Sequence, residues 1–194
     1  MASTKLTRTP SGAGNKKTFT WSGWVKRSGL GAIQGLFTVD TGSGESAFGF
    51  LADDTLRLYL NIASNYPTIV TNAVFRDTSA WYHIAFAVDT TQSTEADRVK
   101  IYVNGSQVTS FSSASYPTQN ADTDFNTTNP HEIGFYSNQT GGAGYFDGQL
   151  AHVHFTDGYA YAASSFGSTA TNGQWVPNLN PSVTYGTNGY FLKF

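Results

Sequence analysis

The sequence contains no cysteine, which excludes disulfide bonds and thiolate metal sites and suits a protein assembled inside a reducing cell. Charged residues make up only 12% of the chain, and no apolar run approaches the roughly 18 residues that a membrane-spanning helix needs. Residues 1–17 lack the apolar segment of a secretory signal. Aromatic residues reach 15%, and the composition therefore predicts an all-β domain and not a disordered chain.

Positive charge gathers at the start of the chain. The basic residues that precede the first acid, Asp40, are Lys5, Arg8, Lys16, Lys17, Lys26 and Arg27. The net charge of −2 therefore combines +6 in residues 1–27 with five basic and thirteen acidic side chains in the remainder. Two interpretations are open: an arm that meets an acidic partner surface, or a solvated loop and strand edge. Because these residues form neither a helix nor a known module, we expect no nucleic-acid partner.

Short alternating runs separated by Gly, Asn, Asp and Pro predict a single β-sandwich domain over residues 1–194. Residues 1–17 are expected to form a basic arm with the first strand, and residues 168–194 a C-terminal loop with the closing strand. The predicted strands lie at 3–9, 18–27, 35–41, 47–52, 55–61, 67–75, 81–89, 99–111 (a hairpin), 131–138, 145–155 and 189–194. A polar loop is predicted at 112–130 and a helical turn at 161–167.

The alternation also assigns side chains to faces. Phe19, Trp21 and Val25 share one face of the strand at 18–27, and Trp24 points the opposite way. Trp24 is therefore predicted on an outer sheet surface or beneath a neighbouring subunit. The Asn104-Gly105 pair predicts a type I′ turn, because both of its residues tolerate positive φ.

Several segments carry a family resemblance when they are taken in order. FTWSGWVKR (19–27), WYHIAFAVD (81–89), VKIYVNGSQV (99–108) and YFDGQLAHVHF (145–155) together resemble the concanavalin A-like, laminin G-like jelly-roll domains. The resemblance covers about residues 15–160 and implies a sandwich of two antiparallel sheets. Such domains include glycan binders, enzymes, adhesion modules and structural proteins, so the fold leaves the function open.

A second resemblance concerns the two ends of the chain. LTRTPSGAGNKKTFTWSGWVKRS (6–28), together with FDGQLAHVHFTDGYAYAASSFG, GQWVPN and YGTNGYFLKF, resembles virion proteins of tailed marine and cyanobacterial bacteriophages. It implies a non-enzymatic structural protein on the virion surface, carried by the major capsid or tail protein in many copies or as a homo-oligomer. Capsid decoration is preferred to a tail fibre, because no coiled coil or shaft repeat is present. The alternative is a carbohydrate-binding adhesin that attaches the virus to host-surface glycans.

Enzyme chemistry is not indicated. Laminarinase-type relatives carry Glu-x-Asp-x-x-Glu on one strand, where alternation places the carboxylates in a cleft. The glutamates of this chain, Glu45, Glu95 and Glu132, lie far apart, and no Gly-x-Ser-x-Gly, Walker or His-Glu-x-x-His motif occurs. We therefore assign no catalytic residue.

Calcium is an alternative that the resemblance leaves open, because Ca²⁺ binds at the sandwich edge of many laminin G-like domains through six to eight oxygen ligands. The acids that loops could offer are Asp89, Glu95, Asp97, Asp122, Asp124 and Asp147. None belongs to a spaced Asp-x-Asp-x-Asp-Gly loop, so we expect no cofactor. Asp147 is expected to cap its own turn.

His152 and His154 stand two residues apart, so on a regular strand they share a face. A zinc site would need a third and fourth ligand, and we assign no metal. Ala151, Val153 and Phe155 are expected to face the core, which leaves both imidazoles on an outer face that touches a neighbouring protein. The predicted partner-contact residues are Lys16, Lys17, Arg27, His152 and His154. An interface of this kind ought to change strength between about pH 5 and 8.

A glycan site is the other candidate, around the Gly-rich turn at 139–144. Exposed aromatic rings stack on sugars, and neighbouring polar side chains hydrogen-bond the hydroxyls. The candidates are Tyr136, Asn138, Tyr145 and Asp147. In the alternative interpretation, these tyrosines pack against the edge of their own sandwich.

Overall fold

The alternating segment at 18–27 forms strand β2 (Thr18–Arg27) in the computed structural model, which describes residues 4–62, 65–137 and 144–194. Phe19, Trp21 and Val25 are buried on one side of β2, as the alternation predicts. The Asn104-Gly105 pair has φ values of 47° and 82° and joins β8 (Val99–Val103) to β9 (Ser106–Gln107), which confirms the predicted hairpin.

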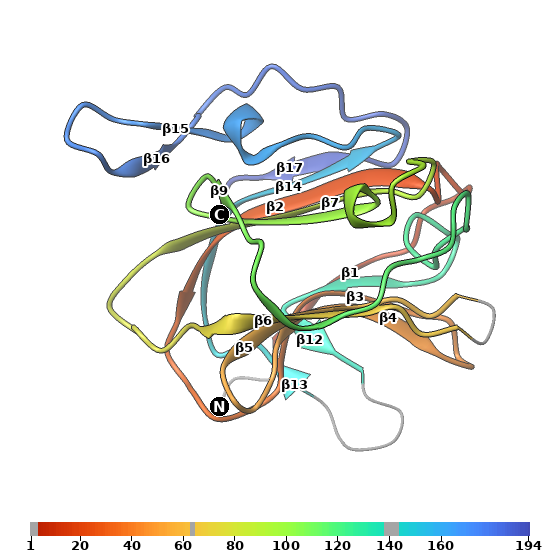
Figure 1. Ribbon diagram of the computed structural model, residues 1–194, viewed down its shortest axis with the longest axis horizontal. Helices are drawn as coiled ribbons and strands as arrows, with labels where there is room; N and C mark the ends of the chain where they lie inside the picture. Colours follow the sequence, from red (N-terminus) through yellow and green to blue (C-terminus); the bar gives the residue numbers. More distant parts are fainter. Residues whose placement is uncertain (1–3, 63–64, 138–143) are drawn as a thin grey trace.

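Two antiparallel sheets face each other and confirm the predicted sandwich (Figure 1). The seven-stranded sheet runs β1 (Leu6–Arg8), β11 (His131–Ile133), β3 (Gln34–Asp40), β4 (Glu45–Phe50), β5 (Thr55–Tyr59), β6 (Thr68–Val74) and β10 (Phe111–Ala114). The six-stranded sheet runs β17 (Tyr190–Leu192), β14 (Gly148–Asp157), β2, β7 (Tyr82–Asp89), β8 and β9. Predicted strands are thus recovered, while β10 lies in a region predicted to be mostly loop.

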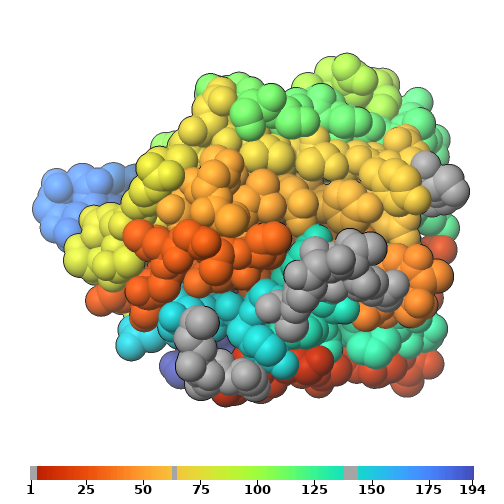
Figure 2. All heavy atoms as spheres, turned by 90° about the horizontal axis from the view of Figure 1, so that it is seen from below, coloured from red at the N-terminus to blue at the C-terminus, as the bar shows by residue number. Residues whose placement is uncertain are grey.

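Smaller elements complete the described chain. They are the hairpin of β12 (Phe135–Tyr136) and β13 (Gly144–Tyr145), the hairpin of β15 (Gly167–Thr169) and β16 (Trp175–Pro177), and the 3₁₀ turns η1 (Glu95–Asp97) and η2 (Ala163–Ser165). Among the described residues, neither of these turns is long or apolar enough to cross a bilayer. Figure 2 views the molecule from the side of the seven-stranded sheet, with the orange and yellow strands crossing this face.

Aromatic rings fill the space between the sheets. Trp21 stacks on Phe86 at a centroid distance of 5.9 Å, and Phe86 lies 4.2 Å from Phe48 of the opposite sheet. Phe125 comes from the segment predicted to be a polar loop, yet it is fully buried and stacks on Phe37 at 5.1 Å. This loop therefore contributes a core residue, although the residues around Phe125 in the sequence are mostly polar.

The residues after β14 form an additional layer. They fold back over the outer face of the six-stranded sheet, as the blue segment in Figure 1 shows. Ala85 and Ala87 of β7 are buried beneath this layer in a small apolar cluster with Tyr102, Ala163 and Trp175. The outer face of the sheet is thus largely covered by the chain itself, which the prediction of a simple loop did not anticipate.

A β-bulge in β14 changes which side chains face outward. The register of β14 with β2 shifts between Ala151 and His154, and His152 occupies the left-handed region with φ of 49°. Ala151 consequently pairs with Trp24, while Val153 is fully buried in the core. The expectation that Ala151 faces the core is therefore wrong, because the extra residue inverts the alternation across the bulge.

Candidate functional site

Tryptophan is concentrated on one outer surface. Of the four tryptophans in the chain, Trp21 is in the core, and the other three line a groove of about 780 Å³. Trp24 belongs to β2, Trp81 precedes β7, and Trp175 begins β16. We call this the tryptophan groove; its lining is Trp24, Ala80, Trp81, Asn104, Ala151, His152, Gly173, Gln174, Trp175, Val176 and Pro177.

A buried histidine connects two of the tryptophans. The His83 ring lies 5.4 Å from Trp24 and 5.8 Å from Trp175, measured between ring centroids. Its Nε2 shares a hydrogen bond of 2.8 Å with the Ser22 hydroxyl. Burial, with a smaller contribution from the nearby His154, lowers the pKa of His83 to about 4, so the ring is neutral at physiological pH. His83 therefore supports the floor of the groove and adds no charge to it.

Two glycines determine where Trp175 lies. A Cβ at Gly105 would fall 2.5 Å from the Trp175 ring, and a Cβ at Gly167 would fall 2.7 Å from it. Gly105 also has φ of 82°, a value that its place in the β8–β9 turn requires. The Trp175 indole therefore packs directly on the Gly105 backbone, where a side chain would collide with it. The position of the ring thus depends on a glycine in the Asn104-Gly105 turn.

Uncharged polar groups lie beside the rings. The Asn104 Oδ1 accepts a hydrogen bond of 2.8 Å from the His83 N–H, which leaves the Asn104 amide nitrogen as a donor. Gln174 is exposed, and its Oε1 accepts from Asn172, so its amide nitrogen is also a donor. The described lining contains no Asp, Glu, Lys or Arg. Aromatic faces with amide donors, and without carboxylate, ammonium or guanidinium groups, form a surface suited to a neutral, hydroxyl-rich ligand.

His152 reaches the groove because of the bulge. Its backbone N–H donates to the Lys193 carbonyl at 3.1 Å, and its ring lies 5.5 Å from Phe191. The Nδ1 atom is buried and has no partner among the described residues. His152 therefore lies on the outer side of the sheet, as predicted, at the wall of a groove lined by the chain's own tryptophans.

His154 does not form the predicted displayed pair with His152. It is buried, stacks on Phe191 at 4.1 Å and shares a hydrogen bond of 2.9 Å with the Tyr185 hydroxyl. Burial, with a smaller contribution from the neighbouring His152, lowers the pKa of His154 to about 4. The expectation that this imidazole touches a partner and titrates between pH 5 and 8 is wrong, because the C-terminal layer covers it.

Arg27 was predicted to contact a partner protein, but its side chain lies inside the molecule. Its side chain is 0% exposed, and it donates to the Phe75 carbonyl at 2.7 Å and to Asp54 at 2.9 Å. The expectation that Arg27 contacts a partner is therefore wrong, because the guanidinium is an internal ion pair. Lys16 and Lys17 remain partly exposed and lie 2.6 and 3.9 Å from Asp122, and their contact with a partner stays a prediction.

The residues predicted to bind glycan lie elsewhere and do not form an exposed aromatic platform. Tyr136 is buried, accepts a 2.7 Å hydrogen bond from Arg57, and has its pKa raised to about 12, chiefly by burial. Tyr145 packs against Phe135 at 4.6 Å, as the alternative interpretation held. The Asp147 carbonyl accepts from the Ser28 N–H at 2.8 Å. Asn138 lies outside the described residues.

Sequence reasoning placed two members of the tryptophan groove, Trp24 and His152, on an outer sheet face. The others were missed because Trp175 lies in a segment predicted to be loop, far from Trp24 along the chain. The available signal was the scarcity of tryptophan: the chain has four, and only Trp21 shares a strand face with predicted core residues. Within the described part of the chain, no group of three or more His, Asp or Glu side chains converges on a metal position.

Comparisons with known proteins agree with the fold. A family model described as the concanavalin A-like lectin/glucanases superfamily matches residues 2–164. A native heptameric SAP-like pentraxin from Limulus polyphemus is similar, with a TM-score of 0.57 and 18% identity, over 100% of this chain and 88% of that one. No curated protein is significantly similar in sequence.

Two other solved structures are parts of proteins that act on carbohydrates or were solved with them. Domain 4 of an extracellular arabinanase from Geobacillus stearothermophilus, in complex with arabinotriose, has a TM-score of 0.55 and 19% identity over 77% of this chain and 65% of that one. The CBM40 of the Ruminococcus gnavus IT-sialidase, bound to α2,3 sialyllactose, has a TM-score of 0.51 and 16% identity over 81% and 92%. At these identities, the similarity shows the fold alone.

Proposed function

The chain belongs to the concanavalin A-like lectin/glucanases superfamily, and we propose that it is a non-catalytic carbohydrate-binding module. Its ligand is a neutral saccharide that lies in the tryptophan groove. The observation that supports this proposal is the convergence of Trp24, Trp81 and Trp175, from three separate parts of the chain, on one surface whose described lining has no Asp, Glu, Lys or Arg.

The groove offers the two kinds of contact that a sugar needs. Indole rings can cover the apolar C–H face of a pyranose or furanose and remove it from water. The amide nitrogens of Asn104 and Gln174 can donate to hydroxyl oxygens. A carboxylated sugar would lose its hydration without gaining a lysine or arginine partner in the described lining, so the surface favours neutral sugars over acidic ones.

The proposed absence of catalysis also has a physical basis. Glycoside hydrolysis by the usual routes needs a pair of carboxyl groups roughly 5 to 9.5 Å apart across the scissile bond. The described lining of the groove contains no carboxyl group. A saccharide held there would meet neither a general acid nor a nucleophile of that kind.

The test is calorimetric titration of the purified protein with neutral trisaccharides, beginning with arabinotriose and the corresponding xylose, glucose and galactose oligomers. Trp81→Ala and Trp24→Ala should each weaken binding by about tenfold or more, as expected for aromatic anchors. Tyr66→Ala is the matched control, because this tyrosine is 54% exposed and lies outside the groove. Sialyllactose should bind much more weakly than the neutral sugars.

Two outcomes would refute the proposal. One is an absence of saturable binding to any neutral glycan on a broad array. The other is binding that survives both tryptophan substitutions in proteins whose circular dichroism and unfolding midpoint match the parent.

We further propose that the ligand is a glycan of a host surface, the adhesin alternative that the sequence left open. Display on a tailed-phage virion, as adhesin or as capsid decoration, remains a prediction from the sequence resemblance. Mass spectrometry of purified particles would test it through the presence and copy number of this chain. Charge reversal at Lys16 and Lys17, followed by the same measurement, would test their predicted contact with a virion protein; unchanged incorporation would count against that contact.

A further inference from the structure

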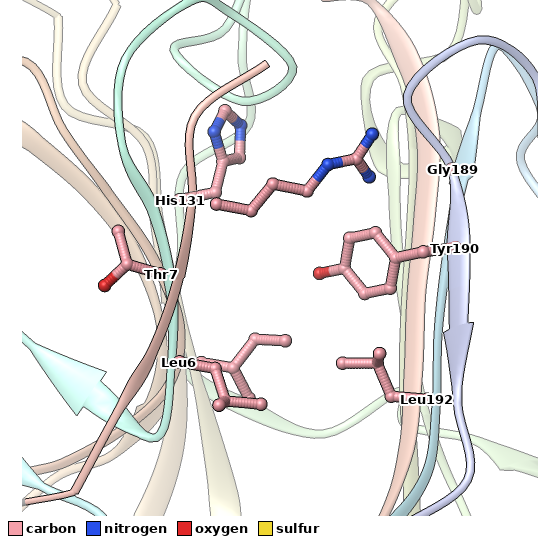
Figure 3. A pocket seen from close by; sticks show the side chains of 8 residues that line it. Leu6, Thr7, His131, Gly189, Tyr190 and Leu192 are labelled. Atoms are coloured by element: carbon pink, nitrogen blue, oxygen red, sulfur yellow. The ribbon is translucent and has the colours of Figure 1, made fainter.

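A second cleft opens between the edges of the two sheets, away from the tryptophan groove. Its volume is about 470 Å³, and its lining is Leu6, Thr7, Arg8, His131, Ile133, Gly189, Tyr190 and Leu192. Figure 3 shows Leu6 and His131 on one wall, from β1 and β11, facing Tyr190 and Leu192 of β17 on the other. β1 and β17 are edge strands of three residues each, so the sandwich is not closed by long strands on this side.

Most of the wall is apolar. Leu6, Ile133 and Leu192 supply aliphatic surface, and Leu6 is 44% exposed although it faces the cleft. In Figure 3 the Thr7 side chain points away from the cavity, so its hydroxyl does not contribute to the lining. An aliphatic group placed here would remove this surface from water at a gain of roughly 25 cal/mol per Å².

Arg8 places a positive charge at this apolar wall. Its Nη1 donates to the Asn188 carbonyl at 2.6 Å, and its Cζ lies 5.4 Å from the centroid of the Tyr190 ring. These contacts tie the guanidinium across the cleft, from β1 to the chain that leads into β17. Nη1 makes the one hydrogen bond found for this side chain among the described residues, and no Asp or Glu occurs in the lining.

The other polar groups of the lining are neutral. The Asn126 N–H donates to His131 Nε2 at 2.8 Å, so His131 carries its proton on Nδ1 and donates it to the Asn129 carbonyl. Burial lowers the pKa of His131 to about 4, which keeps the ring uncharged. The phenol of Tyr190 points toward the opposite wall in Figure 3, which places its hydroxyl inside the cleft. Burial raises the pKa of Tyr190, so the hydroxyl keeps its proton and can donate it in a hydrogen bond.

We propose that this cleft binds an aliphatic monocarboxylate, with the chain among Leu6, Ile133 and Leu192 and the carboxylate on Arg8. A guanidinium that is already held in place by one hydrogen bond can present its free N–H groups to a carboxylate with little further loss of side-chain entropy. The Tyr190 hydroxyl is a second donor on the same wall. A cleft of about 470 Å³ lies in the size range of pockets that hold small organic ligands, which suits a hydrocarbon chain of medium length.

Charge complementarity selects this occupant over two others. A neutral alkyl chain would leave the guanidinium without an anion, and an inorganic anion would leave the aliphatic wall in water. A carboxylate with a hydrocarbon tail satisfies both surfaces at once, since the charged and apolar parts of the ligand match those of the cleft.

The experiment is calorimetric titration of the full chain with sodium decanoate below its self-association concentration, with decanol as the matched neutral probe. Decanoate should bind saturably and more tightly than decanol. Arg8→Gln, which keeps a donor for the Asn188 carbonyl but removes the charge, should weaken decanoate binding by about 10- to 100-fold and leave decanol binding almost unchanged. Tyr190→Phe should weaken decanoate binding a few-fold.

The control variant is Lys193→Gln, which removes an exposed cation next to β17 and outside the cleft lining. It should bind decanoate like the parent, as should Trp81→Ala, because the tryptophan groove is a separate site. The proposal is overturned if decanoate shows no saturable binding, or if decanol binds the parent as tightly as decanoate does. It is also overturned if folded Arg8→Gln retains parental affinity. The comparison of decanoate with decanol on the parent decides the matter should Arg8→Gln not fold.

Discussion

Removal of the carboxylate at Asp54 is expected to reveal how strongly the buried ion pair with Arg27 holds the two sheets together. Arg27 is on β2 of the six-stranded sheet, and Asp54 precedes β5 of the seven-stranded sheet. The guanidinium is 0% exposed, donates to Asp54 at 2.9 Å and lies 4.3 Å from the Phe50 ring. Asp54 also receives an ion pair from the more exposed Arg76 at 2.9 Å.

The expected cost of Asp54→Asn is about 3 to 5 kcal/mol of the free energy of unfolding, because the substitution leaves a buried cation without an anion. At this chain length, 1 kcal/mol corresponds to roughly 2 to 4 °C, so the melting temperature should fall by about 6 to 20 °C. The double variant Arg27→Met, Asp54→Asn should be more stable than the sum of the single losses predicts, since it removes both charges together.

The measurement is urea unfolding near pH 7, monitored by tryptophan fluorescence and circular dichroism. Burial opposes ionisation of Asp54, yet hydrogen bonds from the Gly31 N–H and from two guanidinium groups outweigh it and hold the pKa of the carboxyl below its usual value. The stabilisation is therefore complete above the unfolded pKa of about 4 and is lost as the pH falls through the lower folded pKa. Asp53→Asn is the control, because Asp53 is exposed, and it should cost about 1 kcal/mol or less. A loss below about 1 kcal/mol for Asp54→Asn would refute the reasoning.

Other expectations concern pH, the groove and a polar network. Stability should rise between about pH 4 and 6.5, because burial lowers the pKa of His83, His131 and His154 to about 4 while unfolded histidine titrates near 6.5; unfolding midpoints across this range that stay constant would contradict it. Gly105→Ala should destabilise by about 1 to 2 kcal/mol and weaken saccharide binding, because its φ is positive and its Cβ would meet a groove tryptophan; calorimetry and urea unfolding check both parts. Asp157→Asn should cost about 2 to 4 kcal/mol in urea, because the buried carboxylate accepts hydrogen bonds from three distant segments; a loss near zero would show that water replaces those bonds.

The alternation of apolar and polar residues predicted individual strands and turns of the sandwich well. β2 begins and ends where the alternation places it, and the Asn104-Gly105 turn forms because its two residues accept positive φ. β7 lies one residue inside its predicted segment. These elements depend on side-chain period and turn chemistry, which neighbouring residues alone determine.

The candidate site was much less predictable. The bulge at His152 inverts the alternation of β14, and a single extra residue leaves no trace in an apolar-polar pattern. Arg27 was taken for a surface charge because burial of a charge depends on a partner, and Asp54 lies 27 residues away. The position of Trp175 depends on two glycines, each from a different hairpin.

By itself, the sequence determined the all-β class, the strand segments, the resemblance to concanavalin A-like domains and the outward direction of Trp24. Only the tertiary structure decided what covers each outward face. The C-terminal layer buries His154 and brings Trp175 to Trp24, while the β1 and β17 edges leave a cleft beside Arg8. The physical reason is that period and propensity are properties of neighbouring residues, whereas burial and charge pairing depend on segments that meet only in the folded chain.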